Sequence, residues 1–369
     1  MTTYELLKTH FEQYPEMKPQ DAVKLLYQGE FGGGHMIDDE VSSLERIRKE
    51  WKGRLKSPLP GSGGFEEEGG KADCRDELLS WCEPVGNGLF RLSLCSLDHG
   101  LLPETLNRMF VITASEKRGS REGFQNKLAV LSDCAANGIA PFTRGELDCY
   151  LSAYEKEGCP AVSHSPEYRS KYHPSYRIVS EPFIKFLQIF YDIDRCMEKI
   201  TDRPVLVSLD GKSGSGKSTL GGLLKQVYGC GLFHMDDFFL RPSQRTGARL
   251  MEPGGNVDYE RFHEEVLDHV IRGEDFSYRR YDCCSQTLTD PIEVKAARLN
   301  IVEGVYSRHP YFGECYDLNY FLTISEEEQK RRILERNGPV MLERFLNEWI
   351  PMENRYFEEF GIDGTVINV

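Results

Sequence analysis

The 369-residue sequence lacks any apolar run long enough to span a bilayer, and its N-terminus lacks an apolar stretch followed by small residues. These absences argue against a membrane protein and against a secretory signal or transit peptide, so we expect a cytoplasmic protein. Cysteine pairs with C-x-x-C spacing are also lacking, although the chain has 11 cysteines. An odd number of cysteines without a signal predicts reduced thiols rather than a disulfide framework or a zinc site.

Positive charge is in deficit: 45 Lys and Arg face 59 Asp and Glu, which gives a formal net charge of −14. This balance opposes non-specific attraction to phosphate backbones, so we expect no nucleic-acid partner. A small anionic ligand held locally is still compatible with it. The length favours two domains over one.

Helical periodicity dominates the first half of the chain, in segments 2–51, 103–158 and 181–200, the last predicted as one amphipathic helix. The stretch "SPLPGSGGFEEEGGKAD" (57–73) has the composition of a loop insertion, and residues 89–94 have strand character. We place a domain boundary near Asp202, with a mainly α-helical domain at 1–201 whose role the sequence does not reveal.

Short apolar runs alternate with helical segments after the boundary: "VLVSL", "LFHMD", "LNIVEG", "LNYFLTI" and "TVINV". This alternation is typical of a parallel sheet with crossover helices. We therefore expect the domain at 202–369 to be α/β.

The stretch "GKSGSGKST" after the first of these runs fits the phosphate-loop pattern G-x-x-x-x-G-K-[ST], with Gly211, Gly216, Lys217 and Ser218 at its fixed positions. The alternative is a plain glycine-rich turn between strand and helix. However, a lysine at the start of a helix is electrostatically misplaced unless an anion sits there. The motif therefore predicts a nucleoside triphosphate site in a P-loop parallel sheet, with Ser218 as a magnesium ligand.

Two aspartates, Asp236 and Asp237, come directly after the second apolar run, where ligands of open α/β sheets bind. Phosphoryl transfer to an alcohol needs a carboxylate that orients or deprotonates the hydroxyl. Solvated turn aspartates are the alternative interpretation.

Six stretches occur in the order seen in the uridine kinase and phosphoribulokinase family: "GKSGSGKST", "MDDFF", "GGNVDYERF", "YRRYD", "IVEG" and "RRILERNG". The resemblance covers nearly the whole chain after Arg203, and bacterial proteins labelled uridine kinase-like are similar to it. It implies a small-molecule kinase that uses ATP and Mg²⁺, with Asp236 as catalytic base and Lys217 also catalytic. The loop residues that would hold the nucleotide are Gly211, Ser213, Gly214, Ser215, Gly216, Lys217, Ser218 and Thr219.

The resemblance also implies acceptor and metal residues. Asp258 resembles the aspartate that binds the acceptor's ribose hydroxyls, although it equally suits an N-cap. Tyr281 matches a base-contacting tyrosine, whereas Gln286 stands where a uridine kinase carries a histidine. Glu303, after another buried strand, resembles an acidic residue near magnesium, with a surface turn glutamate as the alternative.

The stretch "RRILERNG" resembles the family's lid helix, whose arginines clamp the triphosphate. It supplies Arg331, Arg332 and Arg336, of which Arg336 is the favoured catalytic candidate, and a solvated basic face is the alternative. The chain has "NGPV" where family members carry a further arginine. His234 and His309 have no partner pattern and suggest structural or exposed roles.

Two stretches in the first half are unusual. "GEFGGGHMIDDE" suits either a ligand site or a turn before an acidic helix start, and "PAVSHSPEYRSKYHPSYRIV" (160–179) suits an anionic or aromatic ligand. For the second stretch we favour tyrosines that pack an interdomain surface.

The expected function is ATP-dependent phosphoryl transfer to a hydroxyl of a small molecule, with a nucleoside such as uridine or cytidine as the first candidate. Pantothenate, a sugar phosphate and glycerate are alternative acceptors. A different class of function is an ATP-binding switch whose helical domain binds a macromolecule. The sequence does not determine whether the protein forms a homo-oligomer.

Overall fold

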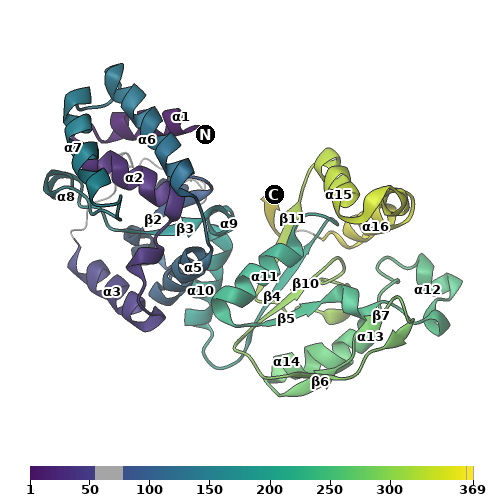
Figure 1. Cartoon of the computed structure of the whole chain (residues 1–369). Coiled ribbons are helices and arrows are strands. Elements are labelled where there is room, and N and C mark those ends of the chain that lie inside the picture. The colour runs from purple at the N-terminus through teal and green to yellow at the C-terminus, as the bar shows by residue number, and fades with distance from the viewer. Residues whose placement is uncertain (55–77, 363, 369) are drawn as a thin grey trace, which may run out of the picture. The chain divides into compact units, whose positions relative to one another are not determined.

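The computed structural model describes residues 1–54, 78–362 and 364–368, which divide into two compact units, Met1–Asp194 and Arg195–Val369 (Figure 1). The loop expected at 57–73 lies outside the described residues. No helix in the described ranges is long and apolar enough to cross a membrane.

Unit 1 is mainly helical, as expected. Its first helix begins with a capping box, in which Thr2 Oγ1 accepts from the Glu5 amide at 3.2 Å and the Glu5 carboxylate accepts from the Thr2 amide at 2.7 Å. The helices of the unit are α1 (Thr3–Gln13), α2 (Pro19–Phe31), α3 (Glu40–Gly53), α5 (Pro103–Ser115), α6 (Arg121–Ala136), α7 (Arg144–Lys156), α8 (Pro166–Tyr172), α9 (Glu181–Lys185) and the first part of α10 (Leu187–Lys199), whose last residues belong to unit 2.

A three-stranded antiparallel sheet lies among these helices, in the order β1 (Cys82–Gly86), β2 (Leu89–Ser93) and β3 (Tyr176–Ser180). Helix α2 approaches β1 closely, because a Cβ atom on Gly29 would lie 1.9 Å from the Val85 carbonyl oxygen. The core of the unit gathers apolar and aromatic side chains of several elements, including Leu7, Leu26, Leu89, Phe124 and Tyr168.

The single helix expected at 181–200 is wrong, because the chain breaks at Phe186 into α9 and α10. Apolar residues occur there in adjacent pairs, "FI", "FL" and "IF", and adjacent side chains on a straight helix point about 100° apart. Phe183 and Leu187, on either side of the break, are both buried in unit 1.

Unit 2 contains a five-stranded parallel sheet in the order β12-β11-β4-β10-β5. Each of the five apolar runs found in the sequence forms one strand: β4 (Val205–Gly211), β5 (Gly231–His234), β10 (Leu299–Glu303), β11 (Leu318–Thr323) and β12 (Thr365–Asn368). The expected α/β class is thereby confirmed. The carboxyl ends of β4, β5 and β10 meet at one edge of the sheet, where the loops that follow them come together.

Helices and two short hairpins complete unit 2 (Figure 1). Helix α11 contacts β4, β5 and β10. The helices are α11 (Lys217–Tyr228), α12 (Gly247–Met251), α13 (Tyr259–Phe262), α14 (Asp268–Arg272), α15 (Glu326–Arg344) and α16 (Ile350–Phe360), with π-helical turns at His263–Leu267 and Phe345–Trp349. The hairpins pair β6 (Phe276–Tyr278) with β9 (Ile292–Val294) and β7 (Tyr281–Asp282) with β8 (Thr287–Leu288).

Candidate functional site

The glycine-rich stretch forms a tight loop between β4 and α11. Gly211 has a φ of +133° and lies so close to β11 that a Cβ atom would be 2.1 Å from the Leu322 carbonyl oxygen. Gly216 has a φ of +91° at the start of α11. Only glycine adopts such geometry without strain, so the spacing of the motif follows from the path of the backbone.

Lys217 curls back over this loop. Its ammonium group is buried and donates to the carbonyl oxygens of Gly211 at 2.8 Å and Lys212 at 3.0 Å. The hydroxyl of Ser215, also buried, has no hydrogen-bond partner among the described residues. A buried cation at the N-terminal end of a helix, beside an unused donor, forms a site suited to an anion.

Ser218, which follows Lys217 in the loop, contacts an acidic side chain on the neighbouring strand β10. Ser218 Oγ donates to Glu303 Oε1 at 3.0 Å, and His234 Nδ1 hydrogen-bonds the same oxygen. Glu303 and His234 are paired residues at the ends of β10 and β5. The hydrogen bond to Glu303 raises the pKa of His234 above its ordinary value. No partner pattern for His234 is present in the sequence, and its neighbour Glu303 becomes apparent only from the pairing of β10 with β5.

Asp236 lies two residues beyond the end of β5, in the helical turn Met235–Phe238. Burial raises the pKa of this carboxyl, and the negative charge of Glu303 raises it further, while Lys217, His234 and Arg336 oppose the shift. A raised pKa makes a carboxylate a stronger base at neutral pH. Burial also raises the pKa of Asp237, whose carboxylate accepts a long hydrogen bond of 3.5 Å from the Tyr278 hydroxyl.

Lys217, Ser218, Asp236 and Glu303 line one cavity of about 1140 Å³ in unit 2. The predicted residues that line it are Ser213, Gly214, Gly216, Lys217, Ser218, Thr219, Asp236, Gln286, Glu303, Arg332 and Arg336. Gly211, Ser215, Arg331, Asp258 and Tyr281 are not among its lining residues.

The predicted residues outside the lining have other contacts. Asp258 caps α13, because its Oδ1 accepts from the Arg261 amide at 3.3 Å, and its Oδ2 accepts from Gln244 Nε2 at 2.8 Å. The Tyr281 hydroxyl accepts from Arg245 Nη2 at 3.2 Å, and Arg245 itself lines the cavity. Arg331 is exposed and pairs with two glutamates of its own helix.

The arginines of α15 differ in their relation to the loop. Arg332 Nη1 donates to the Gly214 carbonyl oxygen at 3.2 Å, so this side chain reaches the phosphate loop directly. Arg336 Nε donates to Asn337 Oδ1 at 2.7 Å. The helix is then interrupted at Gly338, which has a φ of +77° and precedes Pro339.

The sequence did not indicate that the segment after this interruption, residues 341–353, lines one side of the cavity. Met341, Arg344, Phe345, Glu348, Trp349, Met352 and Glu353 all line the cavity. The Glu353 carboxylate accepts from the Ser213 amide at 3.1 Å and from the Ser213 hydroxyl. The apolar spacing of this segment predicts a helix face, but no motif marks what that face covers.

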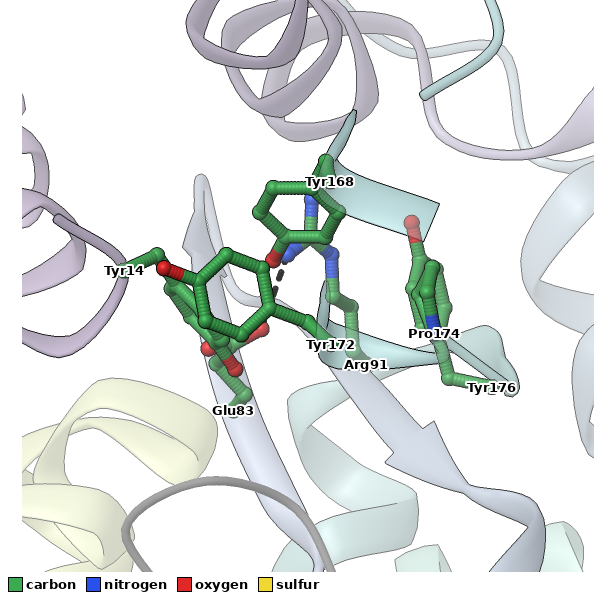
Figure 2. Close-up of a pocket in the computed structure, with 7 residues that line it drawn as sticks. All are labelled: Tyr14, Glu83, Arg91, Tyr168, Tyr172, Pro174 and Tyr176. Carbon is green, nitrogen blue, oxygen red and sulfur yellow. Dashed lines mark hydrogen bonds and ion pairs between the residues drawn. The ribbon is translucent and has the colours of Figure 1, made fainter. Parts of the chain in front are cut away.

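The tyrosine-rich stretch of unit 1 packs inside that unit. Its rings gather around the Arg91–Glu83 ion pair, whose atoms are 2.8 Å apart, and enclose a cavity of about 10 Å³ (Figure 2). This volume holds about one water molecule. The contacts of these rings lie within unit 1 and not at the expected interdomain surface.

The glycine-rich stretch of unit 1 leads into a capped helix. Asp39 caps α3 by accepting from the Ser42 amide at 2.9 Å, and Asp38 pairs with Arg46. Within the described ranges, no three His, Cys, Asp or Glu side chains are grouped so as to hold a metal ion by themselves.

Comparison with known proteins gave matches among solved structures, while no family model matches the chain. A possible uridine kinase from Bacillus stearothermophilus aligns over 48% of this chain and 99% of its own, with 17% identity and a TM-score of 0.36. A candidate fructose transport system kinase from Silicibacter sp. TM1040 aligns over 47% and 96%, with 21% identity and a TM-score of 0.39. The YGR205w protein aligns over 49% and 87%, with 16% identity and a TM-score of 0.34. Uridine kinase-like and other P-loop kinases are thus among the solved structures that this chain resembles over about half of its length.

Proposed function

We propose that this protein transfers the γ-phosphoryl group of ATP to a hydroxyl group of a small molecule. The observation that carries the proposal is that Lys217 of the phosphate loop, the Ser218–Glu303 pair and Asp236 line the same cavity. A nucleotide switch needs the loop and the magnesium ligands but has no use for a further carboxylate with a raised pKa beside them.

The side chains present fit Mg·ATP. Magnesium is commonly held by one or two carboxylates together with substrate phosphates, so Ser218 and Glu303 suffice without a larger cluster of acidic residues. Lys217 and the amides of the loop would hold the phosphates. When bound, the ion neutralises charge on the phosphates during transfer.

Asp236 is proposed to accept the proton of the acceptor hydroxyl as its oxygen attacks the γ-phosphorus. The proton passes to a carboxylate oxygen, and the bond between the γ-phosphorus and the bridging oxygen breaks to release ADP. Arg332, which reaches the loop, and Arg336, which lines the cavity, would offset the charge on the phosphoryl group.

The acceptor is proposed to be a nucleoside of the uridine or cytidine kind. Gln286 and Asn256 line the cavity and offer amide groups that can pair with a polar ring edge. Tyr281 and Asp258 act indirectly in this arrangement, because Arg245 and Gln244 occupy their polar atoms. Pantothenate, a sugar phosphate and glycerate are the alternative acceptors.

The test is ADP release by the purified protein with Mg·ATP and each of five acceptors: uridine, cytidine, pantothenate, ribulose 5-phosphate and glycerate. Asp236→Asn is expected to lower acceptor-dependent turnover by about 100-fold or more while ATP still binds. Asp275→Asn is the matched control, since Asp275 is exposed and pairs with Lys295 on a hairpin. Turnover with a different acceptor would keep the chemistry and reject the nucleoside. ATP binding without acceptor-dependent release would reject the kinase in favour of the switch.

A further inference from the structure

A carboxylate occupies the phosphate loop. Glu353, on α16, accepts hydrogen bonds from both the amide and the hydroxyl of Ser213, the third residue of the loop motif. Its side chain is only 4% exposed, so the contact is made away from solvent. Burial raises the pKa of Glu353, whereas the bonds from Ser213 and the charge of Lys217 favour its ionised form.

This contact is chemically unusual for such a loop. Amide and hydroxyl donors around a buried lysine are suited to phosphoryl oxygens, which are also anionic acceptors. The two oxygens of a carboxylate resemble two oxygens of a phosphoryl group in charge and spacing. Glu353 therefore satisfies donors that a triphosphate would otherwise use.

The helix that carries Glu353 is tied to the same strand end by a second bond. One turn further along α16, the Tyr356 hydroxyl donates to Asp210 Oδ2 at 2.9 Å, and Asp210 directly precedes the loop. Asp210 Oδ1 in turn accepts from the Gly211 amide at 2.7 Å. When the Glu353 side chain, three residues away, leaves the loop, the Tyr356 contact remains, and α16 is then held by fewer contacts.

We propose that Glu353 is a built-in competitor for the nucleotide: its carboxylate takes the place of phosphoryl oxygens at Ser213 in the free protein, and Mg·ATP must displace it. The proposal rests on the proposed function, because it assumes that the loop binds a triphosphate. It adds a regulatory contact within the chain, through which a shift of α16 relative to the loop alters nucleotide affinity.

The first test compares Mg·ATP affinity in the full chain by isothermal titration calorimetry. Glu353→Gln keeps the size of the side chain but removes its charge and one of its two acceptor oxygens, so we expect affinity to rise about tenfold. Glu353→Ala is expected to raise it at least as much. Glu358→Gln is the matched control, with the same change at an exposed position of the same helix, and its affinity should equal that of the wild type.

Equal or weaker binding by Glu353→Gln, with a wild-type protein that binds Mg·ATP, would overturn the inference and leave the proposed function standing. Absence of Mg·ATP binding in the wild type and in all variants would overturn both. Pyrophosphate is the second probe: the same rise in affinity for pyrophosphate would locate the competition at the phosphates rather than at the base.

Hydrogen–deuterium exchange on the wild type provides a test that needs no variant. Displacement of Glu353 removes one of the contacts that hold α16 on the loop, so amide exchange at 350–360 should become faster when Mg·ATP is added. Slower or unchanged exchange there, at saturating nucleotide, would contradict the proposal.

Discussion

Lys217 shows how strongly a single side chain in this cavity favours the binding of an anion. Its ammonium group is buried and contacts only backbone carbonyl oxygens in the hydrogen bonds described. Two neutral acceptors compensate poorly for the loss of water around a full charge. The arrangement is stable enough to fold but is improved by any phosphate that replaces the carbonyl oxygens.

Lys217→Ala is expected to weaken Mg·ATP binding by roughly 100-fold or more, because it removes a charge-assisted contact to the outer phosphates from a desolvated site. Calorimetry on the full chain measures the change. Lys225→Ala, near the exposed end of the same helix, should leave the affinity unaltered. Comparable losses in both variants would indicate non-specific charge attraction instead of a defined site.

The predicted residues that line the cavity include those whose position follows from local chain geometry. Lys217 and Ser218 follow a glycine turn, Glu303 ends the buried strand β10 and Asp236 lies in the turn after β5, so the edge of a parallel sheet brings them together. Glu353 could not be predicted, since its contact with Ser213 depends on how α16 packs. His234 is an intermediate case, because the sequence places it near a strand end, but its contact with Glu303 can be inferred only when the order of the strands is known.

At the scale of elements, continuous apolar runs predicted all five strands of the parallel sheet, since both faces of such a sheet are covered. The break within 181–200 was harder to predict, because the helical spacing of apolar residues continues across Phe186, where the helix itself is interrupted. The role proposed for Asp258 illustrates the same limit. A carboxylate before a helix suits both a cap and a ligand contact, and only the fold shows the cap.

The close approach of α2 to β1 gives a prediction for stability. Gly29→Ala should destabilise unit 1 by about 1–3 kcal/mol or more, because the new Cβ atom would overlap the Val85 carbonyl oxygen unless the backbone shifts. Gly145→Ala is the control, since Gly145 lies in α7 with no atom within 4 Å of its added Cβ, and it should be neutral or stabilising. Urea unfolding measured by circular dichroism distinguishes the two variants. Equal stability would mean that α2 moves away from the strand without loss.

At the scale of the whole molecule, the buried polar network of unit 1 makes its stability sensitive to acid. His164 Nδ1 hydrogen-bonds Asp21 at 3.1 Å and its Nε2 hydrogen-bonds the Tyr176 hydroxyl at 2.7 Å. Burial lowers the pKa of His164 to about 4, and the charges of Arg91 and Lys24 add to this shift, whereas Asp21 opposes it. Below its ordinary value of 6.5, the unfolded chain takes up a proton that the folded chain refuses.

Unit 1 should therefore be most stable above about pH 6.5 and lose up to about 1.4 kcal/mol per pH unit through His164 as the pH falls towards 4. The change His164→Gln should flatten this slope, whatever its effect at neutral pH. Trp349→Phe in both proteins leaves Trp51 and Trp81 as fluorescent reporters of unit 1 alone. Parallel slopes with and without His164 would contradict the prediction.

The strand order of unit 2 has a consequence for how the protein is made. The phosphate loop follows β4, but the two neighbours of β4 in the sheet, β10 and β11, are translated only after a long intervening stretch that ends at Thr323. At typical synthesis rates the ribosome needs about ten seconds to cover it. During that interval the emerging chain carries the loop residues without the sheet that shapes them, so the proposed nucleotide site is complete only after β11 has emerged.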